Sequence, residues 1–440
     1  MPNYMKFNRR DFLGATAAVG SGFATLRGGG QPEELVLASH LGAQAQVYFP
    51  PPDNVGGWRV LKDPTRIRQV AGIDVRRLDQ AFEYTERTSE SGGLLVARHG
   101  WLVYERYFGK GNREANPQMA SVSKAFTSIA CGIMLNEKHS LIPEGLDQKV
   151  FTKEYLPEAF PLDDPRKADI KLGQLLSMTS GIHDESNVAY VRGHHEILAP
   201  VSPLGPEEDL GALSARMWCV PGQGYCYSSA GFQIASIVLR HLTGMELQEY
   251  INERLAKPMQ WGRWGYARQE PRYGLPLPHT PGAFGIALHS TDALRFGYLL
   301  LHKGHWGTHQ LVPAHYFELC SRPSPYDPHA PFSVGFEVNA DGHIIGAPRD
   351  TFLKSGSGGF SLIIVPSLDM VIYKMGSMSS YDQYNPAITG LPLTYKVDHS
   401  RDGWKPLPHD EFYPGRITID DGVHTVIAMV VASIVECDNK

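Results

Sequence analysis

Two strand-rich segments near opposite ends of the chain constrain its fold. Residues 92–108 hold two apolar runs around a His99-Gly100 turn, and residues 360–375 hold two more around Pro366-Ser-Leu-Asp. Strand-like runs that flank a short turn predict a β-hairpin. Helical periodicity dominates the sequence between these hairpins, and a nearly all-apolar helix is expected over residues 425–435, covering the sheet. This order predicts one antiparallel sheet assembled from both ends of the chain.

The predicted fold class is therefore α+β or α/β, an antiparallel sheet flanked by helices with an all-helical domain inserted into it. We assign residues 46–118 and 280–440 to the sheet domain and residues 119–279 to the helical domain. The Pro- and Gly-rich stretch 48–59 is interpreted as a surface loop. The long irregular stretches 183–206 and 379–415 are interpreted as loops that shape a pocket. Further helices are predicted over residues 75–88, 172–181, 231–242, 246–255 and 291–301.

Composition excludes two broad classes of protein. The 440 residues carry a formal net charge of −5 with the signs interspersed, which argues against binding to nucleic acid. The chain contains no run of about 18 apolar residues, so we expect no membrane span. With 42% hydrophobic residues it can still bury a large core.

The N-terminal residues have the pattern of a targeting segment. Paired arginines in Asn8-Arg9-Arg10-Asp11-Phe12-Leu13 precede a mildly apolar run from Gly14 to Leu26. This pattern is typical of a twin-arginine signal, and we interpret residues 1–45 as that signal and its spacer. The alternative is a chance arginine pair at a frayed terminus. The signal predicts a bacterial protein exported by the twin-arginine machinery to the periplasm or beyond, with its cleavage site left open.

The five cysteines follow no zinc-binding pattern. A bridge between Cys219 and Cys226 is an alternative in an oxidising compartment, but isolated thiols are favoured. His183, His194 and His195 also lack a convincing metal-ligand spacing, so solvated loop histidines are the preferred interpretation. We therefore expect no metal.

Ser121 and Lys124 are the first candidates for chemistry. They form the only S-x-x-K in the chain, at the start of an expected amphipathic helix with apolar residues such as Phe126, Ile129 and Ile133. Residues three apart on a helix lie on one face, so the amine can reach the hydroxyl and remove its proton. The alternative is a capping serine with a solvated lysine.

Two downstream stretches hold partners that an activated serine needs. Tyr227 precedes a helix that Ser228 or Ser229 can cap, and its phenol could relay a proton to a leaving group. Lys354-Ser-Gly-Ser-Gly-Gly leads into a strand; glycines such as Gly356 allow close approach of a substrate, and a strand-edge N–H can bind a developing oxyanion. The lysine charge could hold a substrate carboxylate and favour the unprotonated forms of Lys124 and Tyr227. Each stretch alone also fits an ordinary tyrosine or a flexible turn.

The order Ser-x-x-Lys, Tyr-x-Ser, Lys-Ser-Gly resembles that of the penicillin-recognising serine hydrolases, and the chain is similar to the class C β-lactamase-like group among them. Leu175-Leu-Ser-Met-Thr-Ser-Gly-Ile182 and the stretch from Gly285 to Leu301 resemble further segments of that group, so the likeness covers roughly residues 81–375. The group includes β-lactamases, D-amino-acid peptidases, family VIII esterases and 6-aminohexanoate-oligomer hydrolases.

The resemblance implies roles for individual residues. Ser121 would be the acylated nucleophile, Lys124 its base and Tyr227 the proton relay; which of Lys124 and Tyr227 takes the first proton is left open, because coupled groups titrate as a unit. Lys354 would lie beside the site, and the backbone N–H groups of Ser121 and Ser357 would form the oxyanion hole. No metal or organic cofactor is implied.

One departure from the group's pattern limits the substrate. Where the β-lactamases usually carry Asn two residues after the tyrosine, this chain has Ser229, which is shorter and lacks the amide. The expected activity is therefore hydrolysis of a small ester or amide through an acyl-enzyme. The alternatives are a β-lactamase or D-amino-acid peptidase, and a non-catalytic penicillin-binding-type sensor.

Overall fold

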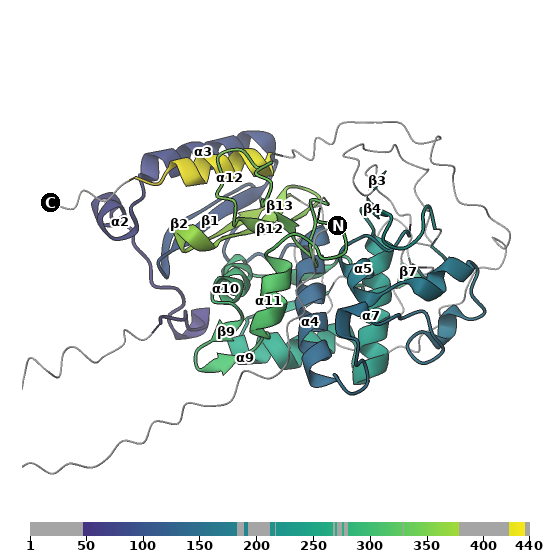
Figure 1. Cartoon of the computed structure of the whole chain (residues 1–440). Helices are drawn as coiled ribbons and strands as arrows, with labels where there is room; N and C mark the ends of the chain where they lie inside the picture. Colours follow the sequence, from purple (N-terminus) through teal and green to yellow (C-terminus); the bar gives the residue numbers. More distant parts are fainter. Residues whose placement is uncertain are drawn as a thin grey trace, which may run out of the picture. The chain divides into compact units, whose positions relative to one another are not determined.

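A six-stranded antiparallel sheet combines strands from both halves of the chain, as expected (Figure 1). Strand β1 pairs with β14 over the register Gly93↔Met375 to Arg98↔Met370, so the first and last described strands in the sequence lie side by side. The strands, in their order across the sheet, are β11 (Glu337–Val338), β12 (Phe352–Gly356), β13 (Phe360–Val365), β14 (Met370–Met375), β1 (Gly92–Arg98) and β2 (Trp101–Phe108).

The computed structural model describes a defined part of the chain. The described residues are 47–182, 189–191, 212–215, 217–266, 269–270, 275–276, 280–328, 330–377 and 422–435. The predicted export segment, most of the irregular stretch 183–206, the whole of 379–415 and Cys437 lie outside them. Among the described helices none is both long and apolar enough to cross a membrane.

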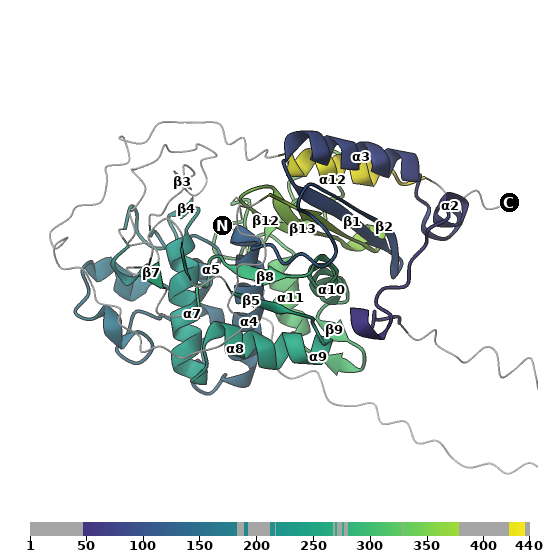
Figure 2. The same cartoon turned by 180° about the vertical axis from the view of Figure 1, so that it is seen from behind.

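Two helices cover one face of the sheet, and both views show them side by side (Figures 1 and 2). Helix α3 (Val75–Thr88) matches its predicted span, and its first turn is capped by Asp74, whose side chain accepts from the N–H of Arg76. Helix α12 (Val423–Ala432) begins two residues before the predicted apolar helix. It buries Val426 and Val430 in the same core as Leu78 and Phe82 of α3. The C-terminal helix therefore covers the sheet, as expected.

The opposite face carries α10 (Ser290–Leu301), which contacts β13 and β14. Phe296 of α10 stacks on Phe126 of α4 (Ser123–Glu137), with ring centroids 3.9 Å apart. This contact joins the sheet side of the molecule to the helices that lie between the two hairpins in the sequence. The remaining helices are α2 (Pro64–Ala71), α5 (Leu172–Leu176), α7 (Ser229–Thr243), α8 (Leu247–Ile251), α9 (Lys257–Met259) and α11 (Ala314–Cys320).

Short strand pairs accompany these helices. Their register is antiparallel in every case. They are β3 (Ala189–Val191) with β4 (Gly224–Cys226), β5 (Trp264–Tyr266) with β8 (Ile286–Leu288), β6 (Gln269–Glu270) with β7 (Leu275–Pro276), and β9 (His305–Trp306) with β10 (His309–Gln310).

Helix α4 differs from the amphipathic helix expected at Ser121. Its residues 123–134 are all buried, because α4 packs against α7 on one side and against Phe296 of α10 on the other. Lys124 has no exposed surface, so the alternative of a solvated lysine is wrong. The polar side chains within residues 123–134, such as Ser123, Lys124 and Ser128, therefore bond to other protein groups and not to water.

Three other local predictions need adjustment. The helix predicted over 172–181 ends at Leu176, and Met178 then adopts a positive φ of 60°. We expected the helix over 246–255 to end before Pro258, but helical residues continue through Pro258 to Met259. A π-helical turn, Asn252–Ala256, shifts the hydrogen-bond register before the proline, which lacks an N–H donor. None of the four described cysteines forms a disulfide bond, so the preference for isolated thiols over a bridge between Cys219 and Cys226 is confirmed for this part of the chain.

The stretch 48–59 is not a simple surface loop, because Arg295 of α10 fixes it. The Arg295 side chain is 1% exposed, donates to Asp292 Oδ1 at 2.6 Å and to the Pro51 carbonyl at 2.7 Å, and also pairs with Asp53. Trp58 is buried as well and donates to the Thr291 carbonyl. Burial raises the pKa of Asp292 although Arg295 opposes that shift. A network of charged groups centred on Arg295 therefore attaches the stretch 48–59 to α10.

Replacing Arg295 with Met is expected to lower the free energy of unfolding by about 3–5 kcal/mol, because Asp292 then stays buried without its cation. Urea unfolding followed by circular dichroism measures the change. The matched control is Arg322→Met, which removes an ion pair to Glu318 at 3.8 Å whose side chains are 69% and 55% exposed. We expect at most about 1 kcal/mol there. Equal losses in the two variants would contradict the role given to Arg295.

Candidate active site

Ser121 lies on a tight turn that leads into α4. The turn is a 3-10 helix, Ala120–Val122, and Ala120 has a positive φ of 46°, which costs a residue with a Cβ about 1–3 kcal/mol. Ser123 stabilises the turn, because its hydroxyl donates to the Ala120 carbonyl at 2.7 Å and accepts from the N–H of Ile286 at 3.0 Å. The strained turn leaves Ser121 half-buried at the front of the helix.

Lys124 contacts three oxygens from three segments. Its Nζ donates to Ser121 Oγ, to Ser229 Oγ and to the carbonyl of Ala283, each at 3.0 Å. An ammonium has three protons to donate, so this buried cation has a partner for each of them. The predicted reach from Lys124 to Ser121 is thus present in the structure, and the same Nζ is tied to α7 and to the segment before β8.

Tyr227 and Lys354 form the other side of the cluster. Lys354 Nζ donates to the Tyr227 hydroxyl at 3.3 Å and to the Ser355 carbonyl at 2.8 Å. Burial lowers the pKa of Lys354, which is 2% exposed, and repulsion from Lys124 lowers it further, against an opposing attraction to Tyr227. The two lysine nitrogens lie 4.9 Å and 5.2 Å from the centroid of the Tyr227 ring. Two lysine side chains from different segments therefore lie beside one phenol.

Gly356 allows the end of β12 to approach the Ser121 turn. A Cβ at this position would lie 2.4 Å from the Met119 carbonyl oxygen and 3.0 Å from the backbone nitrogen of Ser121. Only glycine fits so close to that backbone. The next residue, Ser357, is exposed beside the turn. The N–H groups of Ser121 and Ser357 can bind the same oxyanion only if β12 lies this close to the Ser121 turn. Their role as the oxyanion hole stays a prediction.

The Ser229 side chain does not face a substrate, as the comparison with the asparagine of the β-lactamases suggested, but faces Lys124. Ser229 is the first residue of α7, is 4% exposed, and points its hydroxyl at Lys124. Ser228 is the helix cap, since its side chain accepts from the N–H of Gly231. In this arrangement Ser229 holds the lysine, which is a contact that its position in the sequence did not indicate.

Three further residues at the site were missed by the sequence analysis. Ser123 holds the turn, Ala283 contributes a carbonyl, and Phe332 packs edge-on against Tyr227 and lies 5.0 Å from Lys354 Nζ. Ser123 stood inside the S-x-x-K string and was a detectable candidate. A backbone carbonyl and a lone phenylalanine carry no motif, so no local signal could have found the other two.

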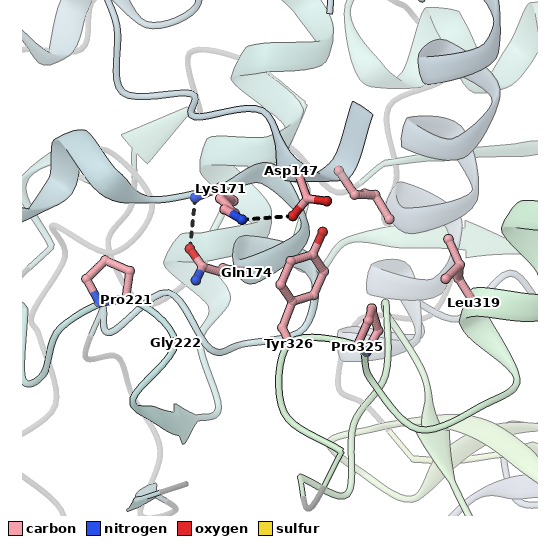
Figure 3. Close-up of a pocket in the computed structure, with 9 residues that line it drawn as sticks. Asp147, Lys171, Gln174, Pro221, Gly222, Leu319, Pro325 and Tyr326 are labelled. Carbon is pink, nitrogen blue, oxygen red and sulfur yellow. Dashed lines mark hydrogen bonds and ion pairs between the residues drawn. The ribbon is translucent and has the colours of Figure 1, made fainter. Parts of the chain in front are cut away.

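A separate pocket lies elsewhere between helical segments, and Figure 3 shows it. It has a volume of about 570 Å³, and its wall carries an ion pair of 3.0 Å between Lys171 and Asp147. None of the predicted site residues lines it. The lining residues are Leu146, Asp147, Lys171, Gln174, Pro221, Gly222, Leu319, Pro325 and Tyr326. Its lining residues include no nucleophile–base pair, whereas Ser121 and Lys124 form one at the other cluster.

Ser121 and Lys124, at the start of one helix, lie close to Tyr227 and to Lys354 on a strand of the antiparallel sheet. This arrangement is typical of the penicillin-recognising class of fold. The sequence model of the Beta-lactamase family matches residues 77–377, which is more than half of the chain, and the chain belongs to this family. The β-lactamase/transpeptidase-like fold predicted from the resemblance is thereby confirmed.

Individual relatives agree with this family assignment. The chain is 29% identical to Esterase EstB of Burkholderia gladioli over 231 residues, covering 49% of this chain and 57% of the relative. It is 25% identical to Penicillin-binding protein 4* of Bacillus subtilis (strain 168) over 192 residues, covering 42% and 40%. The match thus spans about half the length of these curated relatives. Among solved structures, EstCE1, a hydrolase with promiscuous acyltransferase activity, is similar with a TM-score of 0.53 at 18% identity, covering 69% of this chain and 93% of that one.

The geometry predicts how two substitutions change the labelling of the protein by a fluorophosphonate probe. Ser121→Ala is expected to abolish labelling, because the reactive oxygen is removed. Lys124→Ala is expected to slow labelling by at least about 10²-fold, the usual effect of losing general-base help. Labelling rates from gel fluorescence, at equal protein and probe concentrations, measure both effects.

The control for this experiment is Ser140→Ala, which removes an exposed serine after α4 and should label like the unmodified protein. Circular dichroism establishes that each variant is folded. Label that persists on folded Ser121→Ala protein would assign the reactive group to another residue.

Proposed function

We propose that this protein is a serine hydrolase that cleaves a small ester or amide through an acyl-enzyme intermediate. The observation that carries the proposal is the bond of 3.0 Å from Lys124 Nζ to Ser121 Oγ, which places a buried amine against a half-buried hydroxyl. A serine becomes strongly nucleophilic only when a neighbouring base takes its proton. Membership of the Beta-lactamase family and the likeness to an esterase also support it.

The first half of the proposed reaction forms the acyl-enzyme. In the proposed reactive state Lys124 has given up one of its three Nζ protons. Ser121 Oγ then attacks the substrate carbonyl carbon while its proton passes to that amine, directly or through Tyr227. The negative charge that develops on the carbonyl oxygen is held by the N–H groups of Ser121 and Ser357. The bond to the leaving group breaks as Tyr227 donates a proton to it, and the substrate acyl group remains as an ester on Ser121.

The second half releases the acyl group. A water molecule attacks the ester carbonyl and gives its proton to Tyr227, which lost its own proton to the leaving group, and Ser121 Oγ leaves with the proton that Lys124 received in the first half. Lys354, whose pKa is lowered by burial, supplies a donor to the Tyr227 hydroxyl and so helps to hold the phenol near the reacting atoms. This scheme uses only side chains and backbone groups of the chain itself.

The test of the proposed function is a panel of short-chain p-nitrophenyl esters, D-amino-acid amides, linear amide oligomers and a chromogenic cephalosporin. We expect steady turnover of at least one ester or linear amide and little hydrolysis of the cephalosporin, because Ser229 faces Lys124 and offers no side-chain amide to a substrate. Steady-state absorbance and mass spectrometry of the trapped acyl-enzyme measure the outcome, with Ser121→Ala protein as the blank.

Other outcomes distinguish the alternatives. A burst that stops after one equivalent, with every substrate, would sink the hydrolase proposal and favour a penicillin-binding-type sensor. Rapid opening of the cephalosporin would identify a β-lactamase, and preference for D-amino-acid amides would identify a peptidase of that stereochemistry.

We further propose that the protein is exported through the twin-arginine route to the periplasm or beyond. The support is the pair Arg9-Arg10 followed by Phe12-Leu13 and a mildly apolar run. Replacing both Arg9 and Arg10 with Lys is expected to keep the protein in the cytoplasm, as measured by cell fractionation and immunoblotting. Arg27→Lys, which changes an arginine outside the pair, is the matched control. Unchanged export of the double variant would refute the proposal.

A further inference from the structure

A cluster of one carboxylate and two imidazoles lies at the edge of the sheet and shares no residue with the groups that surround Ser121. Glu337 is on β11, the edge strand, and His343 is in the connection from β11 to β12. His424 is in the first turn of α12. Three segments, one of them more than 80 residues away in the sequence, therefore meet at this point.

The potential donor atoms of this cluster converge. The Nε2 atoms of His343 and His424 lie 2.8 Å and 2.9 Å from the same oxygen, Oε1 of Glu337. One donor atom from each of the three residues falls within 4.8 Å of the others. Zinc binds imidazole nitrogen and carboxylate oxygen at about 2.0–2.2 Å, so tetrahedral neighbours lie roughly 3.3 Å apart. Small side-chain movements of a few tenths of an ångström would make room for the ion.

A second carboxylate orients one of the imidazoles. Asp341 Oδ1 lies 2.6 Å from Nδ1 of His343, which directs the opposite ring nitrogen, Nε2, toward Glu337. A histidine that binds a metal commonly donates its other ring N–H to a carboxylate, which selects the tautomer and raises the basicity of the ligand. His343 has this arrangement.

Charge and burial also suit a cation. Glu337 is buried, with 6% of its surface exposed, and an acidic side chain so placed needs positively charged or donor partners. Both Nε2 atoms point at the same oxygen of Glu337, and the two ring centroids are 5.6 Å apart. One ion between these groups would contact all three side chains.

We propose that Glu337, His343 and His424 form a binding site for a divalent transition metal of the zinc class, which fastens α12 to the edge of the sheet. Two imidazoles and one carboxylate match the donors that Zn²⁺ prefers, whereas Ca²⁺ and Mg²⁺ require more oxygen ligands. The histidine side chains are 28% and 24% exposed, which gives the ion access and leaves a coordination position for water. No metal was expected from the sequence, and the proposed ion takes no part in the reaction at Ser121.

The consequence of metal binding would be mechanical. Helix α12 returns to the sheet after the long stretch 378–421, and it contacts α3 and β13 through apolar side chains. The cluster adds a polar attachment from the start of α12 to β11, which pairs with β12, the strand that carries Lys354. An ion that binds only the folded arrangement of these three residues stabilises the fold by mass action.

The test uses the full-length protein after treatment with a chelator and dialysis. Isothermal titration with ZnCl₂ and elemental analysis measure affinity and stoichiometry, and thermal unfolding measures stability with Zn²⁺, Ca²⁺ or Mg²⁺. We expect one equivalent of Zn²⁺ bound and a melting temperature raised by a few degrees with Zn²⁺ alone. His424→Gln and His343→Gln should each lose this equivalent and the stabilisation.

Two further variants make the result decisive. Asp341→Asn keeps all three ligands and should weaken Zn²⁺ binding by about 10-fold or more through the orientation of His343. His139→Gln removes an exposed histidine elsewhere and should leave stoichiometry and affinity unchanged. The proposal is overturned if the unmodified protein and the His343→Gln/His424→Gln double variant bind the same number of Zn²⁺ ions, or if Zn²⁺ stabilises neither. If removal of the ion abolished labelling of Ser121, the claim that the metal site is independent of the catalytic groups would be wrong.

Discussion

The buried ammonium of Lys124 is the interaction on which the rest of the candidate site depends. Removing a charge from water costs several kcal/mol unless hydrogen bonds replace the lost hydration, and here three oxygens do so. Two of these oxygens belong to residues 105 and 159 positions away in the sequence. Because the charge is stable only when all three are in place, Lys124 requires α7 and the segment before β8 to adopt one position relative to α4.

The sheet supplies the complementary surface of the site. Gly356 lets the end of β12 lie against the strained Ser121 turn, and Lys354, two residues earlier on the same strand, reaches Tyr227. The position of β12 depends in turn on β13 and β14, which pair with β1 from the other end of the chain. The geometry of the site therefore depends on the pairing of the sheet strands. A chain in which the two hairpins do not pair would leave Ser121 without the strand beside it.

Buried charges join distant segments in two other places. Arg295 attaches the stretch around Asp53 to α10, and Glu337 attaches α12 to the edge strand through two histidines. Each of these groups is costly to bury alone and favourable when paired, so each makes the position of one segment conditional on another. Apolar contacts such as those of α12 with α3 stabilise the packing, and the charged groups determine which segments pack against each other.

Local features of the sequence determined the spans of α3, β13 and β14, and also the reach of Lys124 to Ser121, because these follow from helix and strand periodicity and from turn residues. The order of the three short motifs indicated the family. Only the tertiary structure decided that Ser229 faces Lys124, that Phe332 packs on Tyr227, and that His424 meets Glu337. Those contacts join residues far apart in the chain, and periodicity, which describes neighbours within a few residues, contains no information about which distant segments come together.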